Sequence, residues 1–549
     1  MYIRKISRKN KDGSTVTYVQ LAHNERDNSK GHAKAKILYN FGRLDALDIE
    51  QLKRLIKSIS RFLPAEDAFE TQVSVQNRGR KLKWITCRSY GGVYLLDAFW
   101  RRLNFDNILE KRLSSRSFAT PIVRAVFSMI ANRCLAPSSK LAITDWVAND
   151  VYIPDLRSIE TQVLYRAMDF LLLHQKELEK EIYWAVADLM NLEVDLLFFD
   201  TTSSYFETED ESELKKRGYS KDKRSDLPQV VIGLAVTRSG IPVKHWVFPG
   251  NTADMKTIET VKNDLSKWRL NRCIFVHDTG MTSESNLQYL QRGGGHYIVG
   301  RKLKSGEVRA EKALGKKGAY TNIKEQLWAK EIFVGNGEKR KRFVLVKNDR
   351  EKARAEKTRE KIVAKIETDI KEINAHKQKG KSKAAQKLKA HRVYGQYIKQ
   401  LKDGRLALNR SRLKDDARYD GKYLIESSDD TLSISDIVLG YKQLYDVEHA
   451  FRTLKTTLEL RPNYHSRDDR IKCHIFISFI ALVFVRMIEH KTDKPWARIR
   501  DEMSRLYYGE FIIESKKVCQ LTEISKEQKA ILDSLDIPAP STIVDICNN

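Results

Sequence analysis

The sequence predicts an α/β fold in which helices cover a mixed sheet, and three features of residues 194–302 support this prediction. Short apolar runs that end in an acid, at 194–200 and 273–278, are typical of buried strands. Apolar residues at helical spacing separate such runs, as at 252–268. The elements follow the order strand, strand, strand, helix, strand, helix, strand, which is typical of a mixed α/β layer.

The segment before this layer contains a small sheet and then a helical region. Residues 1–85 have alternating segments separated by the turn sequences KDGS and ERDNSKG, followed by a short helix at 49–62. From 91 to about 190, apolar residues recur every three or four positions. Within this region the sequence LAPSSK, at 135–140, separates two helices and is either the turn of a DNA-reading helix-turn-helix or an ordinary helical hairpin.

Residues 304–433 interrupt the α/β rhythm with an insert. It contains a predicted hairpin at 331–346 and a strand at 418–427. Between them, residues 350–402 hold 17 Lys/Arg against 6 Asp/Glu, and isoleucines recur at helical spacing. We expect a long basic helix, or an antiparallel pair that turns near 379–381. This arm is either solvated or in contact with phosphates, and the charge of the whole chain favours contact.

Composition and charge favour a nucleic-acid partner. The 549 residues include 99 Lys+Arg and 72 Asp+Glu, a net charge of +27, and 41% are hydrophobic. A chain of this length forms several domains, and an excess of positive charge favours polyanions. There is no phosphate-binding loop sequence, so no nucleotide cofactor is expected.

The cysteines and the apolar runs predict a cytoplasmic location. The six cysteines form no CxxC pair, so neither a disulfide framework nor a cysteine zinc site is indicated. His465 and His474 lie in no metal-binding motif, and a helix-end or phosphate contact is the better interpretation. The longest apolar run, 475–487, is shorter than the ~20 residues that cross a bilayer and predicts a buried helix, so no membrane association is expected.

Two acids occupy positions where chemistry is expected. Asp200 and Asp278 each end a short apolar strand and each precede a threonine. Burying a carboxylate beside an apolar sheet costs several kcal/mol unless a positive charge compensates it. Carboxylate oxygens suit Mg²⁺ or Mn²⁺. The sequence therefore predicts a metal site at the ends of these strands, and a third carboxylate is needed.

Glu448 is the candidate third acid. We expect a helix that begins at Ser433 and continues through Lys455, on which one stripe holds Tyr441, Leu444, Glu448, Arg452 and Lys455. On spacing alone, this stripe either holds a metal with phosphate-binding neighbours or is an exposed face. In the second case Glu448 and Arg452 form a pair worth only ~0.3 kcal/mol.

These residues resemble a known family. The two strand-end acids and the distant Glu are similar to the Asp-Asp-Glu triad of DDE transposases, which have the RNase H-like fold. Tyr441-x2-Leu444-x3-Glu448-x6-Lys455 resembles the Y-x2-R-x3-E-x6-K signature of bacterial insertion-sequence transposases with a large insert before the catalytic Glu. The phrases DTTSSYFE, GYSKDKRSDLPQVVIGL, PGNTAD, HDTGMTSESNL and RYDGKYLIES are also similar to that group. The resemblance covers about residues 194–490.

The sequence departs from the signature at one position. Leu444 stands where the signature has Arg, which removes the phosphate contact of that side chain. Arg452 follows on the same stripe and is the candidate replacement. A basic loop between the first two strands carries Lys221, Lys223 and Arg224, and it either follows the DNA backbone or is a solvated loop.

The resemblance implies an activity and a set of roles. Asp200, Asp278 and Glu448 would bind two Mg²⁺ or Mn²⁺ ions, cleave the transposon ends and transfer the 3′-hydroxyl into target DNA. Tyr441 and Lys455 would contact terminal phosphates. The expected partners are terminal inverted repeats, target DNA and a second copy of the chain on DNA. The expected location is the bacterial cytoplasm, at the nucleoid. The alternatives are a catalytically silent nucleic-acid-binding protein and a metal-dependent nuclease or resolvase of the same fold.

The expected architecture is an RNase H-like mixed sheet flanked by helices, with a β-rich and long-helix insert and helical N-terminal and C-terminal regions. Six segments follow from it. They are a β-rich candidate DNA-end binder (1–85), a helical candidate DNA-binding domain (86–190), the first part of the catalytic core (191–303), the insert (304–433), the second part of the core with the Glu helix (434–490), and a helical candidate dimerisation region (491–549).

Overall fold

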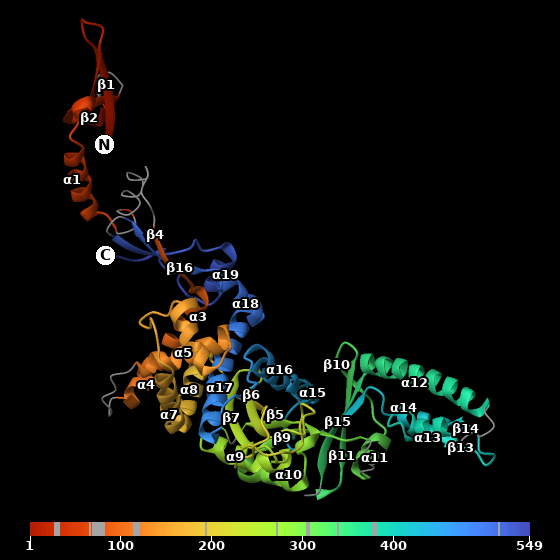
Figure 1. Ribbon diagram of the computed structural model, residues 1–549. Coiled ribbons are helices and arrows are strands. Elements are labelled where there is room, and N and C mark those ends of the chain that lie inside the picture. Colours follow the sequence, from red (N-terminus) through yellow and green to blue (C-terminus); the bar gives the residue numbers. More distant parts are fainter. Residues whose placement is uncertain are drawn as a thin grey trace. The chain divides into compact units, whose positions relative to one another are not determined.

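The computed structural model divides into two compact units (Figure 1). It describes residues 1–26, 33–64, 67, 83–113, 121–192, 195–268, 270, 273–303, 308–337, 340–375, 382–513 and 516–548. The first unit, which we call the terminal unit, comprises Met1–Thr86, Gly509–Gln520 and Ser541–Asn549. The second, the central unit, comprises Cys87–Tyr508 and Leu521–Pro540.

The terminal unit begins with the small sheet and the short helix that the sequence predicts. The three strands β1 (Tyr2–Lys9), β2 (Thr15–Arg26) and β3 (Ala33–Arg43) are antiparallel. Helix α1 (Ile49–Ile59) follows, and its first turn is capped by the Asp48 side chain, which accepts a hydrogen bond from the backbone N–H of Gln51.

The C-terminal region is not wholly helical, which corrects our prediction. It contains α18 (Trp496–Met503) and α19 (Lys526–Ser534) but also three strands. These strands and β4 form a sheet in the order β18-β17-β16-β4. Their bounds are β4 (Lys83–Ser89), β16 (Tyr507–Ile513), β17 (Lys516–Leu521) and β18 (Ile543–Asn548). The pairing of β16 with a strand more than 400 residues earlier is a long-range contact, which local periodicity does not show.

Helices form one part of the central unit, around the buried helix α17 (Asp468–Thr492). The helices before the sheet are α3 (Gly91–Arg102), α4 (Phe105–Leu113), α5 (Ile122–Leu135), α6 (Lys140–Asp145), α7 (Thr161–Leu173) and α8 (Gln175–Met190). Among the described residues, α17 is the one helix long and apolar enough to cross a bilayer, and most of it is buried inside the protein. The predicted buried helix at 475–487 is therefore confirmed.

The central sheet has nine strands in the order β10-β11-β12-β15-β9-β8-β5-β6-β7. The strands that the sequence predicts are β5 (Leu196–Tyr205), β6 (Gln229–Thr237), β7 (Pro242–Pro249), β8 (Ile274–His277) and β9 (His296–Arg301). β5, β8 and β9 are parallel, β6 runs antiparallel to β5, and β7 runs antiparallel to β6. A hairpin of three strands that continues into two parallel strands is the RNase H-like arrangement that we expected.

Helices cover both faces of this sheet. Leu197 and Phe199 of β5 lie in a core with α9 (Thr257–Ser266) and α10 (Glu284–Gln291). Phe198 lies in the core on the other face, together with residues of α15 (Ile434–Lys442), α16 (Leu444–Arg452) and α17. Side chains of a strand alternate between the faces, so Asp200 shares the face of Phe198.

The insert extends the same sheet, which the sequence did not predict. The strands β10 (Thr321–Lys324), β11 (Leu327–Val334) and β12 (Lys341–Asn348) join it through β15 (Lys422–Ser427). The remaining elements are α11 (Val308–Gly315), α12 (Asp349–Ala375), α13 (Lys383–Ala390), β13 (Ile398–Gln400), β14 (Leu406–Leu408) and α14 (Arg410–Ala417). The isoleucines of α12 pack with Ala385 and Leu388, so the predicted helix pair is confirmed. The predicted turn near 379–381 lies outside the described residues.

Candidate active site

Asp200 and Asp278 lie at matching positions of neighbouring parallel strands. Phe198 of β5 is paired with Val276 of β8, and each acid follows its strand partner by two residues. Because side chains alternate and paired strands lie ~4.8 Å apart, both acids project on the same face at the same edge. Asp278 immediately follows β8 and is exposed, whereas Asp200 is half-buried. The backbone register, rather than a local motif, brings these two acids together.

A lysine and a further acid surround Asp200. Lys221 Nζ lies 3.5 Å from Asp200 Oδ1 and 3.3 Å from Asp254 Oδ2. It also donates hydrogen bonds to the backbone oxygen of Thr201, at 2.6 Å, and to its hydroxyl, at 2.8 Å. The Thr201 hydroxyl in turn donates to Asp254 Oδ1 at 2.5 Å. Burial raises the pKa of Asp200, although the Lys221 ammonium opposes this shift.

Tyr441 approaches the second acid from helix α15. Its hydroxyl donates to Asp278 Oδ1 over 3.3 Å. Gly300 on β9 makes this approach possible, because a Cβ atom at that position would overlap the Tyr441 hydroxyl and lie 2.9 Å from Thr279 Oγ1. Burial, and then the charge of Asp278, raise the pKa of Tyr441, so the phenol is a neutral donor.

The helix that carries Glu448 is interrupted, which corrects the prediction of one helix from Ser433 to Lys455. α15 ends at Lys442, α16 begins at Leu444, and residues Thr453–Thr457 form a π-helical turn. A π turn contains more residues than an α turn, so side chains beyond it leave the predicted stripe. Sequence spacing did not predict either interruption.

The three acids line one cavity of about 330 Å³. It lies between the sheet edge and the helices α15 and α16. The residues that line it are Asp200, Asp278, Tyr423, Tyr441, Lys442, Leu444, Tyr445, Val447 and Glu448. The cavity therefore contains the predicted acids, Tyr441 and the atypical Leu444 of the signature.

The other predicted residues do not line this cavity. Arg452 is exposed, and its guanidinium lies 5.9 Å from the centre of the Tyr445 ring. Lys455 Nζ pairs with Asp222 Oδ1 at 2.9 Å. Arg224 pairs with Asp226, and Lys223 is exposed on the same loop. Of the predicted basic side chains, Lys221 is therefore the one that reaches an acid of the triad. The roles proposed for Arg452 and Lys455 stay predictions.

Two residues of this region were missed from the sequence. Asp254 lies in the phrase PGNTAD, which drew attention only as a family likeness, and its contact with Lys221 is long-range. Tyr423 lies in the phrase RYDGKYLIES, and its buried hydroxyl has no hydrogen-bond partner among the described residues. The ring of Tyr423 stacks on Tyr441 with centroids 5.9 Å apart. The likeness of these two phrases to the family was the sequence signal that could have pointed to Asp254 and Tyr423.

The donor set of the cavity suits a hard divalent cation. Its ionisable ligands among the described residues are carboxylates, and Mg²⁺ binds few protein oxygens and keeps several waters. The Lys221 ammonium beside Asp200 already occupies a position that favours positive charge. Within the described ranges, no group of three or more His, Cys, Asp or Glu side chains is compact enough to hold an ion by itself. Water or phosphate oxygens would therefore have to complete the coordination.

Comparison with known protein families shows the class of this protein. The family described as transposase DDE domain matches residues 195–484, more than half of the chain. The chain therefore belongs to the DDE transposases, as its three acids and signature segment predicted. The family described as IS1634 family transposase, N-terminal domain, matches residues 3–71, which include the small sheet of the terminal unit.

Comparison with solved structures finds a match to a piggyBac transposase in a synaptic complex with hairpin DNA, determined by cryo-electron microscopy. The two chains share 10% sequence identity with a TM-score of 0.35, and the similarity covers 72% of this chain and 74% of the other. No curated protein matches the sequence.

Proposed function

We propose that this transposase cleaves the ends of a DNA element and transfers each freed 3′-hydroxyl to target DNA at the cavity that contains Asp200, Asp278 and Glu448. These three carboxylates would hold two Mg²⁺ or Mn²⁺ ions. Two ions bound in this way activate the attacking oxygen and stabilise the leaving oxygen of a phosphodiester. No covalent bond to the protein is needed, so one site can act in both reactions.

One observation carries this proposal. Acids from three segments separated by 78 and 170 residues line the same cavity, at the edge where the parallel strands of the sheet end. Carboxylates repel one another, so their presence in one cavity favours a cationic ligand. In the protein without DNA, Lys221 supplies part of that compensation for Asp200.

The neighbouring residues would position the DNA. Tyr441 donates a hydrogen bond toward Asp278 and can donate to a phosphate oxygen entering the same cavity. Lys442 lines the cavity and offers a positive charge there. Leu444 offers neither a hydrogen-bond donor nor a positive charge, which is consistent with a lost phosphate contact at that position of the signature.

The substrate of the reaction would be DNA with inverted terminal repeats, and two copies of the chain would act on the paired ends. The net charge of +27 supports binding to a polyanion. DNA as the substrate also supports a cytoplasmic location at the nucleoid. Sedimentation of the protein with and without a DNA end measures the number of copies in the complex.

The proposal is tested with purified protein, a labelled DNA end and Mg²⁺. The wild type should nick the DNA at the terminus of the element. Asp200→Asn, Asp278→Asn and Glu448→Gln preserve side-chain size and should bind the DNA but lose cleavage by a factor of 10³ or more, a loss of about 4 kcal/mol of transition-state stabilisation. Full cleavage by one variant would remove that residue from the site.

A matched control separates loss of charge from loss of the site. Glu527→Gln changes an exposed acid of α19 in the same unit and should leave cleavage unchanged. Retention of cleavage in the presence of excess chelator would contradict the role of divalent ions.

A further inference from the structure

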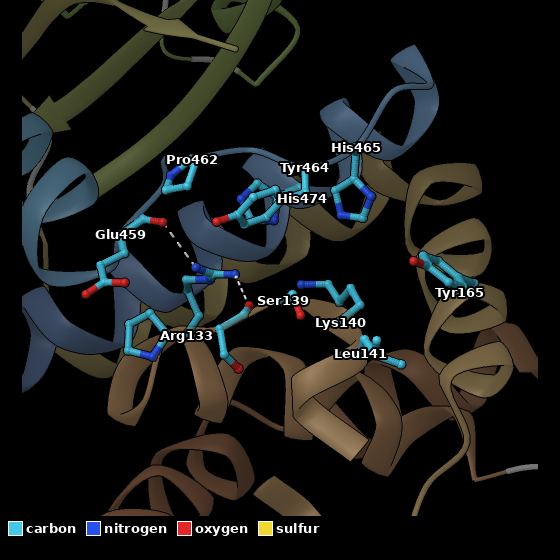
Figure 2. A pocket seen from close by; sticks show the side chains of 12 residues that line it. Arg133, Ser139, Lys140, Leu141, Tyr165, Glu459, Pro462, Tyr464, His465 and His474 are labelled. Carbon is cyan, nitrogen blue, oxygen red and sulfur yellow. Dashed lines mark hydrogen bonds between the residues drawn. The ribbon is translucent and has the colours of Figure 1, made fainter. Parts of the chain in front are cut away.

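A second cavity, of about 530 Å³, lies in the helical part of the central unit (Figure 2). Arg133, at the end of α5, and Lys140, at the start of α6, lie on one side of it. Tyr464 and His474 lie on the opposite side, on the segment before α17 and on α17 itself. None of the residues that line the candidate active site lines this cavity.

The cavity is lined by two buried cations whose donors are not all satisfied. Lys140 and Arg133 are each only 4% exposed. Lys140 Nζ has no hydrogen-bond or ion-pair partner in the part of the chain that the structure describes. Arg133 donates to backbone oxygens of Leu458, Glu459 and Ser138 at 3.0–3.3 Å, but its Nε–H has no partner. Buried donors are normally satisfied, so the Lys140 ammonium, which lines the cavity without a partner, indicates a missing acceptor.

Negative charge at the cavity is scarce. Glu459 is the one carboxylate among the described residues that line it, and its side chain is exposed. Burial, and then the charge of Arg133, lower the pKa of Lys140 to about 7. Burial and the same two cations keep the pKa of His474 well below its usual range. An anion in the cavity would reverse these effects, because it would supply the missing countercharge.

The opening of the cavity suits a nucleic-acid strand. The Tyr464 ring is 76% exposed, and Tyr165 is partly exposed beside it. A neighbouring cavity of about 450 Å³ shares both tyrosines and adds Arg166, Arg467 and Arg470, of which Arg467 pairs with Asp469 and Arg470 with Asp169. Arg470 lies 5.1 Å from the Tyr165 ring centre. Aromatic rings that can stack on bases, next to cations that attract the backbone, are typical of surfaces that bind nucleic-acid strands.

We propose that this cavity binds a backbone phosphate of the DNA on which the transposase acts, with Lys140 and Arg133 as the donors. The proposal rests on the proposed function, because it takes DNA as the ligand. The volume lies within the ~300–1,000 Å³ of ligand pockets, so a phosphate with its sugar can enter. The Ser139 hydroxyl caps α6 by accepting from the backbone N–H of Ala142, and its O–H can still donate to a phosphate oxygen.

The test compares two substitutions that remove the same charge. Lys140→Met removes the buried ammonium, and Lys529→Met removes an exposed one from α19. Binding of a labelled DNA end to the full chain is measured by fluorescence anisotropy without divalent ions, over a range of salt concentrations. Lys140→Met should weaken binding about tenfold and make the slope of log affinity against log salt shallower by about 0.9, the contribution of one phosphate. Lys529→Met should change neither.

Thermal stability separates a binding role from a structural one. Removing an unpaired buried ammonium should leave the melting temperature of the DNA-free protein unchanged or higher. A lower melting temperature together with wild-type DNA affinity would show that Lys140 serves the fold, and the proposal would be wrong. Tyr464→Ala changes an exposed side chain and provides a second variant that leaves the core intact. It should weaken DNA binding, and Tyr464→Phe should not, because the ring is retained.

A third arm distinguishes DNA phosphate from free phosphate. Inorganic phosphate is added at constant ionic strength, and the melting temperature is compared with that in chloride. If phosphate stabilises the wild type but not Lys140→Met, while both bind DNA equally, the cavity is a site for free phosphate and the proposal is overturned. If the wild type does not bind DNA at all, the proposed function fails instead.

Discussion

Gly300→Ala is expected to disrupt the contact between Tyr441 and Asp278, although it adds only one methyl group. The new Cβ would overlap the Tyr441 hydroxyl and approach its Cζ atom and Thr279 Oγ1 at 2.9 Å. Real Cβ atoms do not approach this closely, so the Tyr441 ring must move away from β9. Overpacking of a well-packed region costs about 1–3 kcal/mol, and we expect the free energy of unfolding to fall by that amount.

A double-mutant cycle isolates the cause of this loss. In the Tyr441→Ala background the overlap with the phenol is removed and only the Thr279 hydroxyl, which can rotate away, remains close, so the same substitution should cost less than about 1 kcal/mol. The coupling energy should then be about 0.5–3 kcal/mol, as for residues in direct contact. Gly315→Ala is the matched control, because a Cβ at Gly315 meets no atom within 4 Å, and its effect should stay within about 0.5 kcal/mol.

The assays are urea unfolding of the central unit, followed by tryptophan fluorescence, and cleavage of a DNA end. Displacement of the Tyr441 hydroxyl removes a hydrogen bond to a charged group, worth about 1.5–3 kcal/mol, so cleavage should fall roughly 10- to 100-fold. If Gly300→Ala costs the same in both backgrounds, or cleaves DNA at the wild-type rate, then the proposed fit of Tyr441 against β9 is wrong.

Two further perturbations probe the charges of the central unit. Burial opposes the ionisation of Glu179, but His245 and Lys244, at 2.7 and 2.9 Å, outweigh it and hold the pKa of Glu179 below its usual range. This stabilisation is present above pH ~4.5 and is lost as the pH falls through the lowered pKa. Glu179→Gln should therefore lower the free energy of unfolding, measured in urea, by about 3–5 kcal/mol at pH 7 and by less in acid. An equal loss at both pH values would contradict the lowered pKa of Glu179. Lys221→Met removes the ammonium beside Asp200. The affinity of the DNA-free protein for Mn²⁺, measured by electron paramagnetic resonance, should therefore rise about tenfold. Weaker binding would show that Lys221 orients the ligands instead.

Much of the site was predictable because its acids follow strands that are apolar along their whole length. The runs before Asp200 and Asp278 have no helical period, so they predict buried strands and place each acid at a strand end. Glu448 was found through its spacing to Tyr441 in the signature, and the structure places both in the cavity with the two Asp residues. The family match bears out the transposase that these residues predicted.

Other features depend on contacts that are remote in sequence. Lys455 leaves the predicted stripe because it lies within the π turn that follows α16, and Arg452, the last residue of α16, is exposed. Asp254 reaches Lys221 only because a loop folds back over β5. The propensities of single residues favour a continuous helix in the first case and give no signal in the second.

The sequence by itself determined the class of this protein, since the alternation of apolar strands and helices, the three acids and the positive charge are local or compositional properties. Only the tertiary structure decided which groups share a space. The parallel register of β5 and β8 aligns two of the acids, the insert adds its strands to the same sheet, and the buried cations Arg133 and Lys140 meet around a cavity that no motif marks. The physical reason is that pairing and burial depend on distances in space between segments that are separate in the sequence, which periodicity within one segment does not record.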